Sequence, residues 1–298
     1  PNFIETQEIQ KNFLSDIENK INETSKISSE LKKDIIAIKE KLLNQNISSY
    51  EKEMLTNELI QKNKELENKI NEINKMNQKI NNTLNQVNKN SDEILKKQNE
   101  IEQLLENVMD DELKKLFDEF KKLSENFNKD KFFNISEDLN LSYEQLEDNL
   151  EKNLELLKRY SIEKKVEDNI NQLKELAEDQ SDLSKKIQNS DNNNNSISLD
   201  KQNNLFEELK KEYNELMEEN QDLEQPYNLE EFSDEMNEIS DDFNNSKQQL
   251  SQNNKSKTSK SLQKTSDNLN QLADKMQQMM QSNEAVVMEQ NINELRQI

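Results

Sequence analysis

Residues 59–108 carry the pattern of a helix that buries one narrow stripe of side chains. Positions occupied mostly by apolar residues follow one another in unbroken steps of four and three: Leu59, Asn63, Leu66, Ile70, Ile73, Asn77, Ile80, Leu84, Val87, Ser91, Ile94, Gln98, Ile101, Leu105 and Val108. Such steps keep side chains on one helix face, and their sustained alternation is typical of a coiled-coil seam. We predict one helix from Tyr50 to Met109, about 90 Å long. The polar seam residues should weaken packing and fix the register.

The same spacing precedes this segment. From Leu14 to Leu42 the seam weakens only at Thr24 and Ser28, and it stops between Asn44 and Ser49. Ser48 and Glu51 match the Ser-x-x-Glu capping box, which starts a new helix. Because helices joined by a short turn pack antiparallel, residues 1–111 are predicted to form a long antiparallel helical hairpin.

Aromatic residues mark the next segment. A short helix after Asp110 and Asp111 has a wide apolar stripe, which indicates several packing neighbours. A non-periodic connection is expected to follow it up to Leu141. We interpret five phenylalanines as a packing junction, with a socket for a partner protein as the alternative: Phe117, Phe120, Phe127, Phe132 and Phe133.

Two long stretches of helix are expected beyond the junction. Ser142 and Gln145 form a second capping box before a helix to about Ile187, whose seam changes phase between Leu157 and Ile162. Residues 112–189 would thus contain the junction and this helix, and residues 190–200 a polar linker. Residues 201–298 would contain the last helices, which break at Pro226 and at Asn253–Asn254. No segment alternates with the period of a strand. The predicted fold is therefore all-α, built of elongated antiparallel hairpins or coiled coil, without a β-sheet.

The residue types that are missing exclude many activities. The 298 residues contain no Gly, His, Cys or Trp. Without glycine there is no phosphate-cradling loop and no dinucleotide fingerprint, and the chain should turn without tight left-handed corners. Without His and Cys there is no ordinary zinc site and no Ser-His or Cys-His nucleophile. We expect no catalytic residues, no cofactor and no metal site, and we interpret the adjacent carboxylates, such as Asp241 and Asp242, as solvated helix faces.

The net charge of the chain limits the classes of molecule that it can bind. The formal net charge is −22, and only two arginines occur, Arg159 and Arg296. Nucleic acid is an unsuitable partner for such a chain, because phosphate binding needs clustered Lys and Arg. No run of apolar residues is long enough to span a membrane, so any anchor is expected outside this sequence, which begins and ends like part of a longer chain.

Two clusters near the end of the sequence are candidate contact sites. Four methionines at helical spacing would suit an adaptable partner groove, although core packing is the commoner use: Met276, Met279, Met280 and Met288. The lysines between Lys255 and Lys264 would suit an anionic lipid or an acidic helix, but without aromatic anchors they favour an ordinary exposed helix turn.

Three blocks of sequence resemble a known family, the large membrane-anchored, helix-rich proteins of Bacteroidota that carry only a domain-of-unknown-function label. They are ILKKQNEIEQLLENVMDDELKKLFDEFKKL (94–123), SYEQLEDNLEKNLELLKRYSIEKKVEDNINQLKELAEDQSDLSKK (142–186), and KMQQMM with MEQNINELRQI (275–280 and 288–298). The resemblance implies a longer, membrane-anchored parent protein and a helical region on the periplasmic side of the inner membrane. It implies no catalytic or binding residues.

We therefore expect a non-enzymatic structural, scaffolding or interaction region of a cell-envelope protein, acting as an extended acidic helical rod. Its partners would be other proteins or a second copy, bound through helical seams. The alternative is a regulatory module that docks a partner protein through its Met-rich C-terminal helix.

Overall fold

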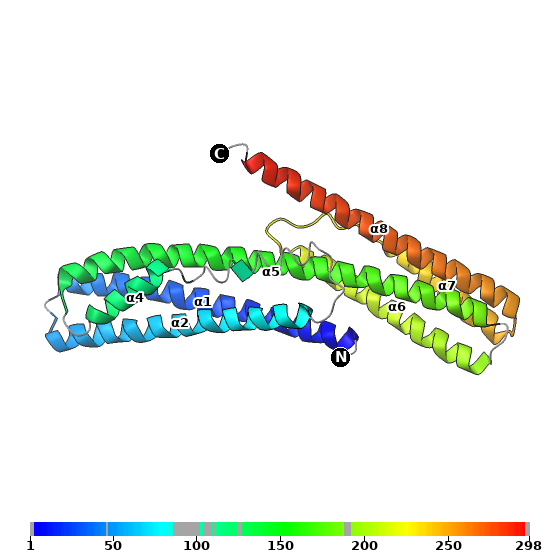
Figure 1. Ribbon diagram of the computed structural model, residues 1–298, viewed down its shortest axis with the longest axis horizontal. Coiled ribbons are helices and arrows are strands. Elements are labelled where there is room, and N and C mark those ends of the chain that lie inside the picture. Colours follow the sequence, from blue (N-terminus) through cyan, green and yellow to red (C-terminus); the bar gives the residue numbers. More distant parts are fainter. Residues whose placement is uncertain are drawn as a thin grey trace. The chain divides into compact units, whose positions relative to one another are not determined.

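Helices make up almost all of the structure. The computed structural model describes residues 3–45, 47–85, 102–103, 109, 111–123, 127–187 and 192–295. Seven long helices lie in these ranges (Figure 1): α1 (Phe3–Asn44), α2 (Ser49–Asn85), α4 (Asp111–Leu123), α5 (Lys129–Lys186), α6 (Asn192–Asn220), α7 (Ser233–Ser251) and α8 (Lys255–Leu295). These ranges contain no strand, so the prediction of an all-α fold is confirmed.

The chain divides into two compact units, which we call unit 1 (Pro1–Ser161) and unit 2 (Ile162–Ile298). The helix α5 contributes its first part to unit 1 and its second part to unit 2. The division falls where the predicted seam changes phase, between Leu157 and Ile162, whereas the domain boundaries expected from the sequence were 111, 189 and 200. A change of phase turns the buried stripe to another side of the helix, so that the two parts of α5 serve different cores.

In unit 1, helix α1 runs antiparallel to both α2 and α5. Ion pairs join Lys69 of α2 to Glu23 of α1, and Lys62 to Asp34, so that residue numbers rise along one helix as they fall along the other. Helix α1 opposes α5 in the same way: the Ser28 hydroxyl donates to the carbonyl of Tyr143 at 3.5 Å, and Lys39 lies over the ring of Phe133. Helix α4 packs against α2 (Figure 1).

The core of unit 1 follows the predicted seams. In α1 and α2 the buried residues include Ile17, Ile21, Thr24, Ser28, Leu31, Ile35, Leu59, Asn63, Leu66, Ile70, Ile73 and Asn77. Thr24 and Ser28, where the seam weakens, are as fully buried as the leucines. The helix predicted from Tyr50 to Met109 is described as far as Asn85, and most of the rest of that prediction lies outside the described residues.

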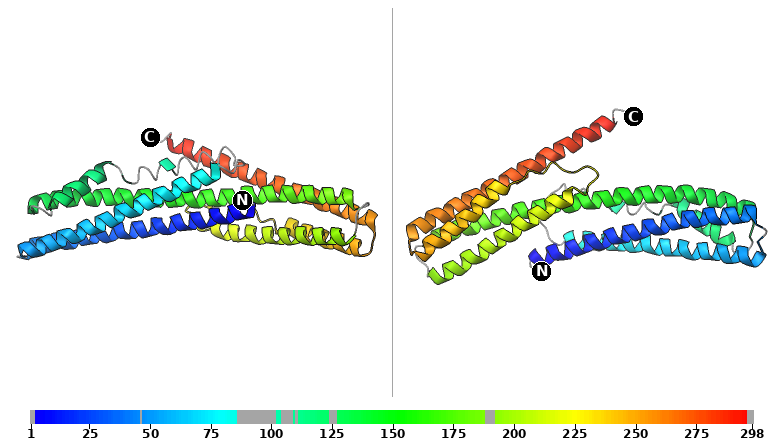
Figure 2. Two further views of the ribbon diagram at one scale, coloured as in Figure 1. Left: turned by 60° about the horizontal axis from the view of Figure 1, so that its bottom comes forward. Right: turned by 180° about the vertical axis from the view of Figure 1, so that it is seen from behind.

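In unit 2, four helical segments pack in a ring, and each is antiparallel to its neighbours (Figures 1 and 2). The pairs that define this arrangement are Gln180 with Gln202 between α5 and α6, Phe206 with Phe243 between α6 and α7, Ser246 with Ser261 between α7 and α8, and Ser184 with Ser259 between α8 and α5. An up-and-down ring of this kind is the ordinary topology of a four-helix bundle.

Two predicted non-helical segments are helical. The connection expected up to Leu141 belongs to α5, which starts at Lys129, so Ser142 lies inside a helix and does not cap one. The buried residues of α5 keep steps of four and three throughout this region: Phe132, Ser136, Leu139, Tyr143, Leu146, Leu150, Asn153, Leu157 and Tyr160. The prediction missed this seam because polar residues occupy several of its positions.

The polar linker expected at 190–200 was wrong for the same reason. Helix α6 begins at Asn192, and its buried side chains include Asn195, Leu199 and Gln202. In the same helix Leu205 is 40% exposed, and the adjacent Phe206 is buried.

The turns work without glycine. The Ser48 hydroxyl accepts a hydrogen bond from the Glu51 N–H at 3.2 Å, which confirms the predicted start of α2. Between α7 and α8, Asn253 adopts a φ of 56°, so one tight left-handed corner exists where none was expected. Asparagine tolerates this conformation better than other residues with a side chain, and Asn254 then caps α8 by accepting a bond from the Lys257 N–H.

Candidate functional site

The Met-rich end of α8 lies in the core of unit 2. Met276, Met279 and Met280 are all buried there, while the side chain of Met288 lies outside the described residues. A partner protein could therefore touch these three methionines only after the helices of unit 2 separated.

Met279 has a specific contact within this core. Its sulfur accepts a hydrogen bond from the Glu230 N–H at 3.1 Å, and the Tyr213 hydroxyl lies 3.8 Å from the same sulfur. The Tyr213 hydroxyl also donates to the Glu230 carbonyl at 2.7 Å. Burial raises the pKa of Tyr213, which keeps its hydroxyl protonated as a donor. Met279 and Tyr213 thus hold residue 230 from two different helices.

Residue 230 belongs to a stretch without helix or strand, residues 226–232, which we call the pinned segment. The Asn220 side chain forms two bonds with Tyr227, accepting from its N–H at 2.9 Å and donating to its carbonyl at 2.8 Å. Asn283 of α8 forms the equivalent pair with Asn228, at 2.8 and 3.1 Å. An amide side chain can satisfy both polar groups of one residue, so these two asparagines replace the partners that a helix or sheet would provide.

A carboxylate from another helix also holds the pinned segment in place. The Tyr227 hydroxyl donates to the carboxylate of Glu163, which comes from α5 and is 7% exposed. The segment is therefore fixed by side chains from α5, α6 and α8. Sequence reasoning missed Tyr213, Asn220 and Asn283, although buried asparagines and tyrosines at seam spacing were the available signal.

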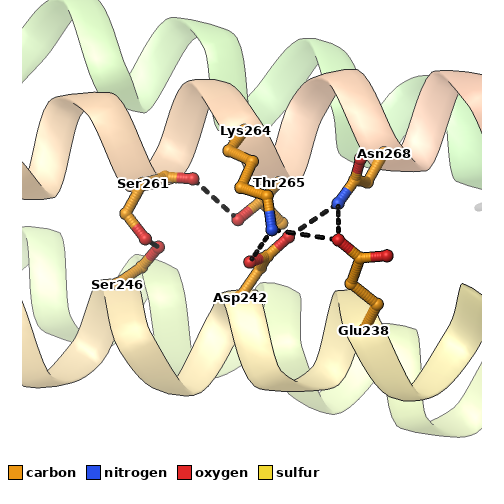
Figure 3. Close-up of polar contacts among 7 residues, drawn as sticks. All are labelled: Glu238, Asp242, Ser246, Ser261, Lys264, Thr265 and Asn268. Atoms are coloured by element: carbon orange, nitrogen blue, oxygen red, sulfur yellow. Dashed lines mark hydrogen bonds and ion pairs between the residues drawn. The ribbon is translucent and has the colours of Figure 1, made fainter.

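A second polar layer lies between α7 and α8 (Figure 3). Asp242 is 4% exposed, and its carboxylate accepts bonds from Lys264 Nζ at 3.0 Å and Asn268 Nδ2 at 2.7 Å. Glu238 shares both donors, at 3.0 Å from Lys264 and 3.4 Å from Asn268. About one helical turn from Asp242 and Lys264, the hydroxyls of Ser246 and Ser261 lie 2.9 Å apart. The buried charge of Asp242 is thus neutralised across the helix pair.

The pKa values in this layer follow from the pairing. The hydrogen bond to Asp242, and then that to Glu238, raises the pKa of Lys264. The bond from Lys264 in turn lowers the pKa of Glu238. Each shift favours the charged form of its residue, so Lys264 and Glu238 are both ionised at neutral pH. Lys264, which we had grouped with the lysines from Lys255 onward, therefore belongs to a contact between helices.

The five phenylalanines of the expected junction lie in or next to the core of unit 1. Phe120 and Phe132 are buried, and Phe117, Phe127 and Phe133 are partly buried. Four of the rings form one group around Phe132, whose centroid lies 5.8 Å from those of Phe120 and Phe127 and 6.2 Å from that of Phe133. Phe117 instead packs against Tyr143. The group joins the end of α4 to the start of α5.

One buried polar pair connects α2 to α5 in unit 1. The hydroxyl of Tyr143, which is fully buried, donates to the side-chain carbonyl of Asn63. Burial raises the pKa of Tyr143, so the hydroxyl remains a donor. Asn63 is one of the polar seam residues that the sequence predicted to fix the register.

Acidic residues do not gather into a metal site in the described ranges. No group of three or more His, Cys, Asp or Glu side chains is placed there to hold a metal ion. Of the adjacent aspartates, Asp242 is bonded to α8 and Asp241 is exposed. Within the described residues, no helix is both long and apolar enough to cross a membrane.

Comparisons with protein-family models, with curated proteins and with solved structures found no match to this chain.

Proposed function

We propose that this chain is a non-enzymatic structural and interaction region of a cell-envelope protein, which presents an extended, acidic helical surface. The observation that carries the proposal is how unit 2 uses the side chains that could do chemistry. Asp242, Glu163 and Met279 each bond to a neighbouring helix or to the pinned segment. Groups engaged in this way specify helix register, and in their present positions they cannot act on a substrate.

Composition gives independent support. A chain with no Gly, His or Cys lacks the residues of most catalytic constellations. Its acidic surface favours solubility, as suits a spacer or scaffold. The assignment to the cell envelope, on the periplasmic side of the inner membrane, rests on the resemblance to the membrane-anchored family alone.

Small-angle scattering tests the extended shape. A compact globule of 298 residues would have a radius of gyration of about 19 Å. We expect a clearly larger value, unchanged by dilution. A value near that of the globule would overturn the proposed rod.

Crosslinking with mass spectrometry tests the interaction role, with the parent protein in its native membrane. We expect crosslinks from exposed lysines such as Lys115 and Lys211 to other proteins or to a second copy. The matched control is the same reaction after detergent extraction and dilution, in which crosslinks between proteins should fall and those within the chain should persist. Only intrachain crosslinks in the membrane would contradict an interaction role.

A further inference from the structure

One end of unit 2 is rich in lysine. The chain reverses direction twice at this end, between α5 and α6 and between α7 and α8 (Figure 1). The contacts between Ser184 and Ser259, and between Asp200 and Lys247, hold the four helices together near it. We call the lysines near these reversals the lysine end: Lys185, Lys186, Lys201, Lys247, Lys255, Lys257 and Lys260.

Charge is strongly segregated along the helices of unit 2. Residues 243–266 include five lysines and no acidic residue, whereas residues 212–235 include ten acidic residues and no basic one. In a chain of net charge −22, the lysine end is therefore a local reversal of sign. The field of the lysines attracts anions to this end of the bundle, and the acidic residues of the remainder repel them.

Three lysines of this end are not neutralised by the described part of the chain. Lys185 pairs with Asp182 and Lys247 with Asp200. Lys201, Lys257 and Lys260 are exposed, and none has an ion pair with any described residue. These three come from α6 and α8, so their charges are spread over the end of the bundle.

The first turns of α6 and α8, at this end, also lack acidic residues. Helices α2, α4, α5 and α7 each carry Asp or Glu in the first turn, as the partial positive charge of a helix start favours. Helices α6 and α8 carry none, and α8 places the exposed Lys257 there. Lysine in this position is unfavourable unless an anion compensates it.

We propose that the lysine end binds an anionic phospholipid surface. A flat layer that presents many phosphate groups can meet lysines from different helices at once, whereas a single small anion needs donors that converge on it. Lysine acts as a compact point charge on a flexible stem, which suits such a diffuse array of phosphate groups. Ile197 is 57% exposed and lies one turn before Lys201 on α6, so an apolar side chain accompanies the charges.

The acidic remainder of the chain is compatible with this contact. The first acid of α8 after Lys260 is Asp267, seven residues or about 10 Å further along the helix. The Debye length at physiological salt is about 8 Å, so repulsion from acids beyond this distance is largely screened. The segregated charge would direct the lysine end, and not the 212–235 region, toward the lipid.

Vesicle sedimentation tests the proposal on the full chain. The probes are vesicles of phosphatidylcholine alone and of equal parts phosphatidylcholine and phosphatidylglycerol. The test variant replaces Lys201, Lys257 and Lys260 with Gln. The matched control replaces Lys115, Lys122 and Lys131, which are exposed in unit 1, and thus removes the same charge.

We expect binding to the anionic vesicles only, with loss of binding as salt is raised. The test variant should bind roughly 100-fold more weakly than the unsubstituted chain, and the control variant should bind as tightly as the unsubstituted chain. Equal binding of the two variants to the anionic vesicles would overturn the proposal. So would a lack of binding by the unsubstituted chain at low salt. Lysine-dependent self-association without vesicle binding would also overturn it, because it would assign the lysine end to the acidic surface of a second copy.

Discussion

The two units fix the register of their helices in different ways. In unit 1 the buried polar contact between α2 and α5 is the Tyr143–Asn63 pair, and aromatic packing gathers around Phe132. In unit 2 buried polar contacts recur along the bundle, from Gln180 and Gln202 to the Asp242 layer and the pinned segment. Apolar seams attract one another in many registers, whereas buried hydrogen bonds are satisfied in only one. Among the described residues, unit 2 therefore relies more than unit 1 on buried polar contacts to specify its helix pairing.

The largest expected effects come from buried phenylalanines, one in each unit. Phe132 and Phe243 are both fully buried, and each packs against other rings. Replacing either with Ala should lower the free energy of unfolding by about 3–5 kcal/mol, because it leaves a cavity. We expect hydrogen exchange measured by mass spectrometry to show lost protection in unit 1 for F132A and in unit 2 for F243A.

Two exposed leucines serve as controls for this pair. Leu141 in unit 1 is 57% exposed and Leu205 in unit 2 is 40% exposed, so their replacement with Ala should change protection little. If F132A and F243A each reduced protection equally in both units, the units would unfold as one, and the comparison between them would fail.

The next largest effect concerns the buried charge of unit 2. Asp242→Ala removes the acceptor of two bonds, one of them from the ammonium of Lys264, and should lower the free energy of unfolding by about 2 kcal/mol. The adjacent Asp241 is exposed, so Asp241→Ala is a control with the same charge change and should cost less than about 0.5 kcal/mol. Urea denaturation followed by circular dichroism measures both. Equal effects would show that the polar layer does not stabilise the α7–α8 pair.

A smaller effect is expected from the polar pair of unit 1. Tyr143→Phe leaves the Asn63 carbonyl without its donor and should lower the free energy of unfolding by about 1 kcal/mol. Replacing both residues, with Phe at 143 and Leu at 63, should restore part of that loss because neither polar group is then left unpaired. The control is Tyr50→Phe at a position that is 76% exposed. Thermal unfolding in which the double variant was the least stable of the four chains would contradict this account.

Sequence spacing predicted the fold class well and the helix starts unevenly. The seams of α1 and α2 and the phase change near Ile162 follow from steps of four and three, and the Ser48 cap follows from the Ser-x-x-Glu motif. The start of α5 and the start of α6 were missed because Ser136, Tyr143, Asn195 and Gln202 occupy seam positions. A polar residue at a seam position interrupts the apolar pattern and therefore resembles the end of a helix. Its burial becomes evident only when its partner on another helix is known.

The candidate sites were harder to predict for a related reason. Core packing was the commoner use expected for the methionines, and Met276, Met279 and Met280 are buried. The contact of Met279, however, depends on Glu230, which lies in a segment without regular spacing. The partners of Lys264 lie on α7, more than twenty residues away. Such contacts depend on which helices become neighbours, and the spacing of residues along one sequence does not reveal this.

The smallest expected effect is at the surface pair that joins α1 to α2. The side chains of Lys62 and Asp34 are 32% and 40% exposed, so water and salt screen their attraction. The hydrogen bond to Asp34 raises the pKa of Lys62, which shows the direction of the interaction. Asp34→Asn should lower the free energy of unfolding by about 0.2–1 kcal/mol at low salt, and by less as salt rises. Urea denaturation at two salt concentrations measures this. A loss as large as that of Asp242→Ala, and insensitive to salt, would mean that unit 1 also depends on charged contacts for its register, and the contrast with unit 2 would then disappear.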